Sequence, residues 1–211
     1  MLGYKAWRES RTRCLLSAAT LGWFCSVLIV FRPMMANAAQ IAYARFVETS
    51  IYEGSIRNLF VIFAVVLGLG GLTQEAERGC APFTLSLPAT RVRHVSARAL
   101  VGLAEVFGLA LLPSGLVLAL APFVHESYPV GVALQHSLRW ALVGLPCFAL
   151  SFLMSIVLSG TYAALIASWV LLIACGIVVL ALPVGVPAAV GIIPAIVMIG
   201  AGAWLTDRQD F

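Results

Sequence analysis

The chain has little charge for its length. Only 10% of its 211 residues are Asp, Glu, Lys or Arg, and Lys5 is its one lysine. A soluble globular domain carries about 25% charged residues. With 62% hydrophobic residues and a mean hydropathy of +1.02, the chain is excluded from that class and belongs in a lipid bilayer.

Motifs for common chemistry are also missing. A phosphate-binding loop GxxxxGK[ST] needs a lysine that reaches the phosphates, and Lys5 follows no such loop. The serine motif GxSxG and the zinc motif HExxH are absent. The five cysteines form no CxxC pair, so neither a disulfide framework nor a zinc site is indicated. We expect a chain that is not an enzyme and that itself holds no metal or cofactor.

The net charge of +4 does not indicate nucleic acid as a partner. The arginines are scattered beside apolar runs, where lipid headgroups explain them more simply. We therefore expect the lipid bilayer as a partner and no nucleic acid.

Apolar runs predict an all-α integral membrane protein with six transmembrane helices. A span needs about 17 to 25 residues. The expected spans are 15–31, 58–72, 97–123 and three more within 140–205. The last stretch contains no charged residue, and its expected breaks lie at 159–161 and 183–187. Pro113 and Pro194 mark expected kinks.

Residues 1–14 form the first expected unit, a cytoplasmic interfacial helix. Tyr4 and Trp7 fall near one helical face and Arg8 and Arg11 on another, which suits a helix lying at the membrane surface. The alternative is a basic flank that only orients the first span. The six-span domain then covers 15–205, and residues 206–211 are a polar cytoplasmic tail.

A secretory signal is the competing interpretation of this end. The basic start, the apolar run and the triplet Ala36-Asn37-Ala38 resemble such a signal with its cleavage site. The apolar run is longer than the ~7 to 15 residues of a signal core, and Arg32 and Pro33 separate it from the triplet. We therefore favour a retained span.

The segment 32–57 mixes charge with aromatic residues, which predicts an interfacial segment on the far side of the membrane. With the N-terminus inside, the inside segments hold nine basic residues and the outside segments four. This distribution favours both termini, and the central loop 73–98, in the cytoplasm.

The central loop 73–98 is the longest well-charged interruption of the apolar sequence. It starts with Glu75, Glu77 and Arg78, and Gly79 then suits a helix end because glycine adopts positive φ freely. Phe83 and Leu87 are four residues apart, which indicates a short amphipathic helical segment. The segment is closed by Pro88 and followed by Arg91, Arg93, His94 and Arg98. An ordinary loop held at the lipid surface by arginines is the alternative.

Glu105 is the one acidic residue well inside an apolar span. A charge there costs ~2.5 to 3.5 kcal/mol on insertion scales, so an intramembrane carboxylate is a candidate functional residue. Arg98 lies two helical turns earlier on the same face, about 10 Å away along the axis. Two interpretations stay open, a structural ion pair or polar contact with Arg98 and a role in a substrate or proton path.

His125, Glu126, His136 and Arg139 surround the next expected connection. Their spacing matches no ligand pattern for a metal. We interpret the group as an ordinary exposed loop.

The central loop resembles that of the ATP-binding-cassette type-2 transporter permeases. The likeness rests on Glu75-Ala76-Glu77-Arg78-Gly79 and on the run from Phe83 to Arg91, FTLSLPATR. The two ends, WRES and DRQDF, are similar to that family's ends. Cys80 stands where the family usually has threonine, and Ala89-Thr90 replaces its commoner Val-Ser.

The resemblance implies a permease half-transporter of the bacterial inner membrane. It would pair with a second permease copy or paralogue and sit on two ATPase subunits, which would hold the ATP and magnesium. A coupling helix between spans two and three would contact the ATPase, and residues 1–14 would be the elbow helix. The residues implied in ATPase coupling are Glu75, Glu77, Arg78, Gly79, Phe83, Leu85, Leu87 and Pro88.

The function expected from this resemblance is ATP-driven export of a substrate that the sequence does not select. Two other classes remain alternatives. One is a membrane-embedded enzyme that uses Glu105, His125 and His136. The other is a binding or immunity protein that acts without an ATPase.

Overall fold

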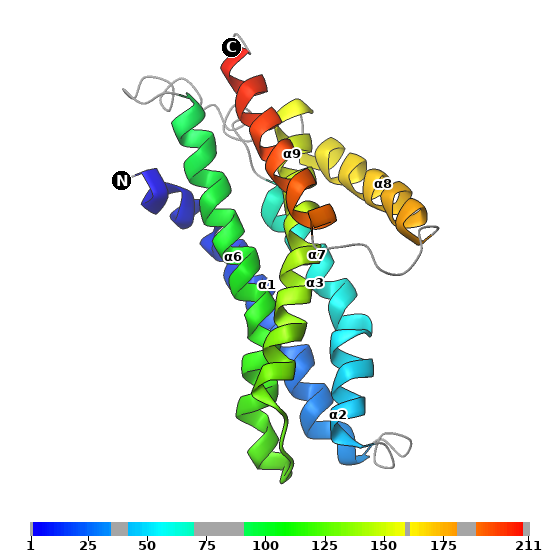
Figure 1. The fold of residues 1–211 in the computed structure, drawn as a ribbon. Helices are drawn as coiled ribbons and strands as arrows, with labels where there is room; N and C mark the ends of the chain where they lie inside the picture. The colour runs from blue at the N-terminus through cyan, green and yellow to red at the C-terminus, as the bar shows by residue number, and fades with distance from the viewer. Residues whose placement is uncertain (1, 35–41, 70–90, 159–160, 181–188, 209–211) are drawn as a thin grey trace.

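The computed structural model describes residues 2–34, 42–69, 91–158, 161–180 and 189–208. These residues form helices and short turns, without a strand among them (Figure 1). Four helical runs in the described part are long and apolar enough to cross a membrane. They are Ala6–Phe31, Tyr43–Gly68, Arg93–Val124 and Val130–Val157. The predicted all-helical class is confirmed, and these four helices have the dimensions of membrane spans.

Helix α1, Leu2–Phe31, is one continuous helix, followed by the 3-10 turn η1, Arg32–Met34. The expected interfacial helix and the first expected span are therefore parts of one helix, without a break at residue 14. No glycine or proline lies between Gly3 and Gly22, so the sequence offers no helix breaker at that boundary.

The second span begins earlier than the sequence predicted. Helix α2, Tyr43–Phe46, continues into the π-helical turn η2, Val47–Tyr52, and α3, Ser55–Gly68, follows after a bend. The described part of the segment expected to be interfacial, 32–34 and 42–57, is thus largely helical. Its charged side chains Arg45 and Arg57 are exposed, whereas Ile51 is fully buried. The helical run Tyr43–Gly68 therefore buries one apolar face and exposes its charged side chains. The predicted second span, 58–72, began too late to include this buried face.

Helix α6, Arg91–Leu120, also starts before the expected span, and the 3-10 turn η3, Ala121–Val124, extends it. The helix therefore includes residues that the sequence placed in the central loop, Arg98 among them. Pro113 lies inside α6 and does not end it.

Three helices are described in and beside the charge-free region, where the sequence predicted three spans. They are α7, Val130–Val157, α8, Thr161–Leu180, and α9, Ala189–Arg208. These helices end at 157 and 180 and resume at 161 and 189, so the predicted breaks at 159–161 and 183–187 lie largely outside the described residues. The predicted start of the fourth span at residue 140 is wrong. Helix α7 begins ten residues earlier and includes His136 and Arg139. Those polar residues are tolerated because Arg139 points outward and His136 is partly exposed.

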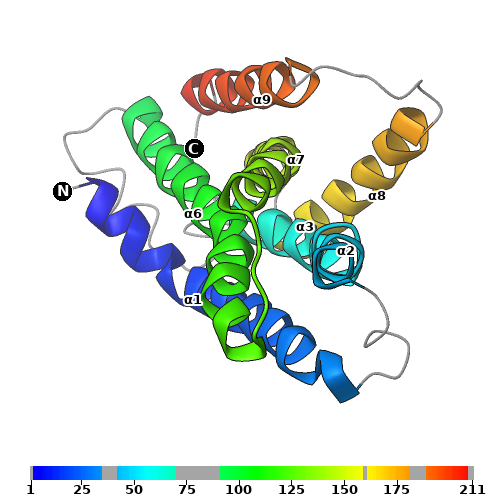
Figure 2. The same cartoon turned by 60° about the horizontal axis from the view of Figure 1, so that its bottom comes forward.

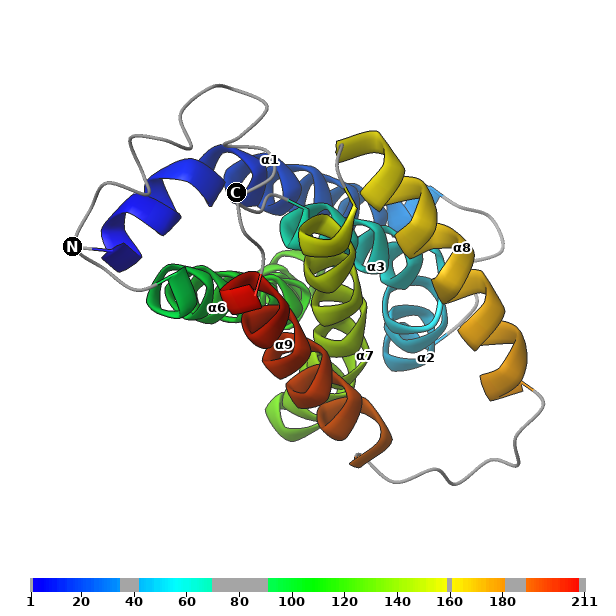
Figure 3. The ribbon, with the colours of Figure 1, turned by 90° about the horizontal axis from the view of Figure 1, so that it is seen from above.

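Helix α7 is the centre of the bundle. It packs against α3, α6, α8 and α9, while α1 lies on α6 and α3 (Figure 2). The view from above shows α8 at the periphery, leaning away from the other helices (Figure 3). Its side chains at Tyr162, Ile166 and Val170 are exposed, as expected of a lipid-facing helix.

A stripe of small residues on α7 permits this packing. Ala133, Ser137, Ala141, Gly144 and Ser151 recur at spacings near 3.5 residues and are buried. Small residues at such spacing let helix backbones approach closely in a membrane. We call these five residues the small-residue stripe.

At the end of α3, the backbones of α3 and α7 are so close that no side-chain atom fits between them. A Cβ atom added to Gly68 at the end of α3 would lie 2.6 Å from the carbonyl oxygen of Phe148. The Ser151 hydroxyl donates to the carbonyl of Val65 at 2.8 Å, so α7 also holds α3 through a hydrogen bond.

Several helix ends gather at one end of the bundle. The N-terminal ends of α1 and α6 and the C-terminal ends of α7 and α9 all lie at the top in Figure 1. The C-terminal end of α1, α2 and η3 lie at the opposite end. There the Arg32 Nη1 and Glu126 Oε1 atoms form an ion pair at 3.1 Å.

Gly144 provides a test of this packing. A Cβ added there would lie 2.6 Å from the Cζ atom of the fully buried Phe60, so we expect Gly144→Ala to lower the free energy of unfolding by about 1–3 kcal/mol. Gly131→Ala on the same helix is the matched control, because nothing lies within 4 Å of its added Cβ. Thermal unfolding in detergent measures the difference. Equal stability of the two variants would contradict the close packing.

Candidate functional site

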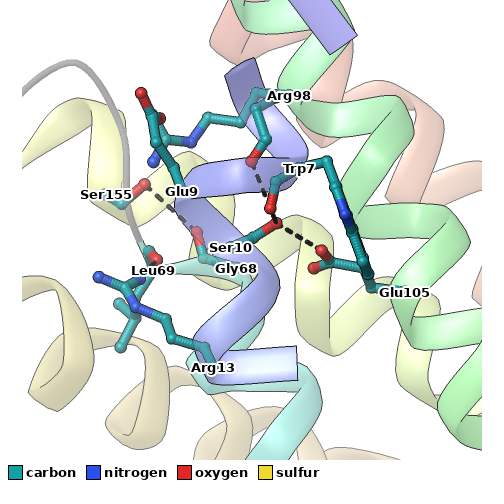
Figure 4. Close-up of polar contacts among 10 residues, drawn as sticks. Trp7, Glu9, Ser10, Arg13, Gly68, Leu69, Arg98, Glu105 and Ser155 are labelled. Atoms are coloured by element: carbon teal, nitrogen blue, oxygen red, sulfur yellow. Dashed lines mark hydrogen bonds and ion pairs between the residues drawn. The ribbon is translucent and has the colours of Figure 1, made fainter. Parts of the chain in front are cut away.

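A cluster of polar groups joins α1, α3, α6 and α7 near the end of the bundle where α1 and α6 begin (Figure 4). We call it the polar junction. Its members are Glu9, Ser10, Arg13, the carbonyl groups of Gly68 and Leu69, Arg98, Glu105 and Ser155. It includes Arg98 and Glu105, the two residues that the sequence marked as a possible intramembrane polar site.

Glu105 is at the buried side of the polar junction. Its side chain is 6% exposed, and its Oε1 atom accepts a short hydrogen bond from the Ser10 hydroxyl. Its Oε2 atom is buried and has no hydrogen-bond partner among the described residues. A buried oxygen without a partner carries a desolvation cost of about 1–3 kcal/mol. This carboxyl group is therefore only half satisfied by the fold.

Arg98 contacts α1 as well. Its Nη1 atom lies 3.4 Å from the Glu9 Oε2 atom. A contact between Arg98 and Glu105 was one of the two interpretations left open by the sequence. The structure gives each of these residues a partner on α1. Both also line one small cavity. These contacts could not be predicted from local sequence patterns, since Ser10 and Glu105 are 95 positions apart.

The end of α3 is held by the same cluster. A helix leaves its last four carbonyl groups without intrahelical donors. The Arg13 Nη1 atom donates a short hydrogen bond to the carbonyl of Leu69, and the Ser155 hydroxyl lies 3.5 Å from that of Gly68. Helices α1 and α7 thus both fasten the point at which the chain leaves α3.

The cavity inside the polar junction has a volume of about 20 Å³. A cavity of ~10–15 Å³ or more with polar walls has room for one water molecule. Glu9, Arg13, Arg98 and Glu105 all contribute to its lining. The polar junction can therefore hold one water molecule.

The residues expected to couple to an ATPase are not part of this cluster. Glu75, Glu77, Arg78, Gly79, Phe83, Leu85, Leu87 and Pro88 lie outside the described residues. The structure does describe both attachment points of that segment, which are Leu69 after α3 and the start of α6 at Arg91.

The four residues expected at the membrane interface lie on α1. Tyr4 is 71% exposed, Trp7 is partly exposed, and Arg8 and Arg11 are exposed. Their exposure leaves them free to contact headgroups, while Ala6 between them is buried.

A second cluster, which the sequence did not predict, lies toward the opposite end of the bundle. Tyr52 is its centre, with the His136 ring stacked on it at 4.2 Å and the Trp140 ring edge-on at 5.9 Å. The Tyr52 hydroxyl lies 3.0 Å from that of Ser114, and the Trp140 indole donates to the Tyr52 carbonyl at 3.1 Å. These contacts join η2, α6 and α7. The aromatic residues interleaved within 43–52 are the feature of the sequence from which this cluster could have been predicted.

The group around the expected loop is divided among different roles. His125 ends η3 with φ 57°, Glu126 pairs with Arg32, and His136 belongs to the stack on Tyr52. In the part of the chain that the structure describes, no three His, Cys, Asp or Glu side chains are placed to hold a metal ion.

Comparisons with known proteins add no assignment. No family model, curated protein or solved structure matches the chain.

Ser10→Ala tests the polar junction. The variant removes the hydrogen bond to Glu105, which then keeps no partner among the described residues, so we expect a loss of about 1–3 kcal/mol in the free energy of unfolding. Ser96→Ala on α6 is the matched control, because its hydroxyl is exposed. Chemical unfolding in detergent gives both values. A loss for Ser10→Ala no larger than that of the control would show that the contact does not stabilise the fold.

Tyr128 predicts a pH dependence. Burial, and then the neighbouring Tyr52, Glu48 and Tyr43, raise the pKa of Tyr128 from 10.0 to about 12. Between these values the folded chain keeps a proton that the unfolded chain loses, so stability falls as the pH rises through this range.

We expect Tyr128→Phe to lose less stability than the parent between pH 10 and about 12. Its hydroxyl has no hydrogen-bond partner among the described residues, so the substitution removes no such contact. Unfolding at several pH values measures this, with the exposed Tyr162→Phe as control. If Tyr128→Phe lost stability with pH in the same way as the parent chain, the raised pKa of Tyr128 would not be the cause of that loss.

Proposed function

We propose that this chain is the membrane-spanning permease subunit of an ATP-driven exporter whose ATPase is a separate protein. The single observation that carries the proposal is the loop sequence from Glu75 to Arg91, which resembles the coupling loop of type-2 ATP-binding-cassette permeases. In this proposal the chain has no catalytic residue of its own. ATP and magnesium are bound by the partner.

The arrangement of the helix ends supports the proposal. A permease of this kind needs its coupling loop and both termini on the ATPase side. The ends of α1, α6 and α9 that flank those segments lie at one end of the bundle (Figure 1). Exposed basic side chains such as Arg8, Arg11 and Arg93 belong to this end, in agreement with a cytoplasmic face.

Six spans also belong to the proposal. Four helices have the required length and apolar character, and α8 and α9 are 20 residues each. A 20-residue helix is about 30 Å long, which matches the hydrocarbon thickness of a bilayer. We propose that α8 and α9 complete the six, with both termini in the cytoplasm of a bacterial cell.

The polar junction supplies a physical route for coupling. Arg13 holds the carbonyl of Leu69 on one side of the segment 70–90, and Glu9 holds Arg98 beyond its other side. A force applied to this segment therefore acts on α3 and α6 and, through the polar junction, on α1. Nucleotide-driven movement of an attached ATPase would reach three spans at once.

In this proposal the N-terminal part of α1 lies along the membrane surface as an elbow. Tyr4 and Trp7 are exposed aromatic residues beside Arg8 and Arg11, the composition of an interfacial helix. The partner permease is a second copy or a paralogue.

The test is purification of the tagged chain from its native membranes in mild detergent, with mass spectrometry of the proteins that accompany it. We expect a soluble ATPase with a Walker A motif. Phe83→Asp removes an apolar anchor of the proposed contact, so we expect it to weaken ATPase association about 30-fold or more, as for a binding hot spot of ~2 kcal/mol. Gly79→Pro is expected to act in the same direction.

Phe123→Asp is the matched control, because it makes the same substitution at a 79% exposed residue at the opposite end of the bundle. Membrane insertion of all variants is checked by fractionation. Undiminished ATPase recovery with Phe83→Asp would reject the loop as the coupling element. A chain that purifies alone would reject the transporter class and favour a binding protein or an enzyme.

A further inference from the structure

A second feature of the structure, a groove between α1 and α6, lies next to Glu105. It has a volume of about 420 Å³, within the ~300–1,000 Å³ of small-molecule sites. Its walls are almost entirely apolar. They include Cys14, Ala18, Val101, Ala104, Leu109 and Leu112.

The groove has one polar end. Trp7 and Glu105 line it at the level where α1 meets the polar junction, and Ala18 and Leu112 line it further into the bundle. Glu105 and Leu112 are seven residues apart on α6, or about 10 Å along the axis. The groove therefore suits a molecule with a polar head and an apolar body.

The polar end offers a buried oxygen atom that can accept a hydrogen bond. The buried Glu105 Oε2 atom has no hydrogen-bond partner among the described residues, while Ser10 occupies Oε1. The Trp7 indole lies next to this carboxyl group (Figure 4). A carboxylate oxygen and an indole face are the two groups that best complement an ammonium ion.

We propose that the groove binds a single-chain amphiphile with a protonated amine head group. The ammonium group donates a hydrogen bond to Glu105 Oε2, and the alkyl chain lies between α1 and α6 toward Leu112. Trp7, which is 41% exposed, lines this end of the groove. This site goes beyond the proposed transport function, and its occupation needs no ATPase.

The first experiment compares two ligands with the same tail on the unaltered chain. The purified protein is placed in phosphatidylcholine nanodiscs, a lipid without an N–H donor, and labelled with a photoreactive alkylamine. Dodecylamine and dodecanol then compete with the label, and mass spectrometry maps it. We expect labelling on α1 and α6, and competition by the amine at roughly tenfold lower concentration, because the alcohol can donate a hydrogen bond to the carboxylate but lacks the positive charge that strengthens it. Equal competition by the alcohol would overturn the proposal.

Two variants locate the site. Glu105→Gln keeps the shape of the side chain and is expected to remove the preference for the amine. Gly108→Leu is expected to fill the groove and to reduce labelling by roughly tenfold, since a Cβ there meets no atom within 4 Å and the residue lines the groove.

Gly115→Leu is the matched control, because it lies on the same helix with the same open surroundings and outside the groove lining. It is expected to be labelled like the parent chain. Labelling of Gly108→Leu equal to that of Gly115→Leu would place the amine elsewhere and reject the groove. Binding in nanodiscs and recovery of an ATPase are separate measurements, so either result stands without the other.

Discussion

Close contact between α7 and its neighbours is the constraint on which the structure depends. In a bilayer, lipid tails are as apolar as leucine, so helices associate through packing and hydrogen bonds rather than through exclusion of water. The small-residue stripe of α7 provides the packing, and Ser151 provides a hydrogen bond to α3. The position of Gly68 against Phe148 fixes where α3 ends, and the polar junction forms at that point.

The sequence predicted the helical class and three helices in the charge-free region, because long apolar runs and the Gly and Pro residues between them are local signals. It misplaced the starts of the second and fourth spans. Hydropathy counts Arg45 or Arg139 against a span, whereas a helix can direct such a side chain outward and bury the opposite face. The exposed Arg57 and the buried Ile56 are neighbours in the chain and illustrate this difference.

Part of the candidate site could be found in the sequence. Glu105 stands out because a lone carboxylate in an apolar run is costly. Its partner Ser10 is an ordinary serine in a basic segment, and only the packing of α1 on α6 brings the two together. The stack of His136 on Tyr52 is likewise a product of tertiary contact. The hydrophobic pattern of one helix shows which of its faces is buried. It does not show which residue of a second helix will lie opposite, because that depends on how the second helix is turned about its own axis.

The continuity of α1 has a mechanical consequence. Its 30 residues correspond to about 45 Å of helix, which exceeds the hydrocarbon thickness of a bilayer. Glu9 near one end of α1 is paired with Arg98, and Arg32 just past the other end is paired with Glu126. A displacement of α1 along its length would therefore strain both ion pairs. The two ends of the bundle are linked by one continuous helix.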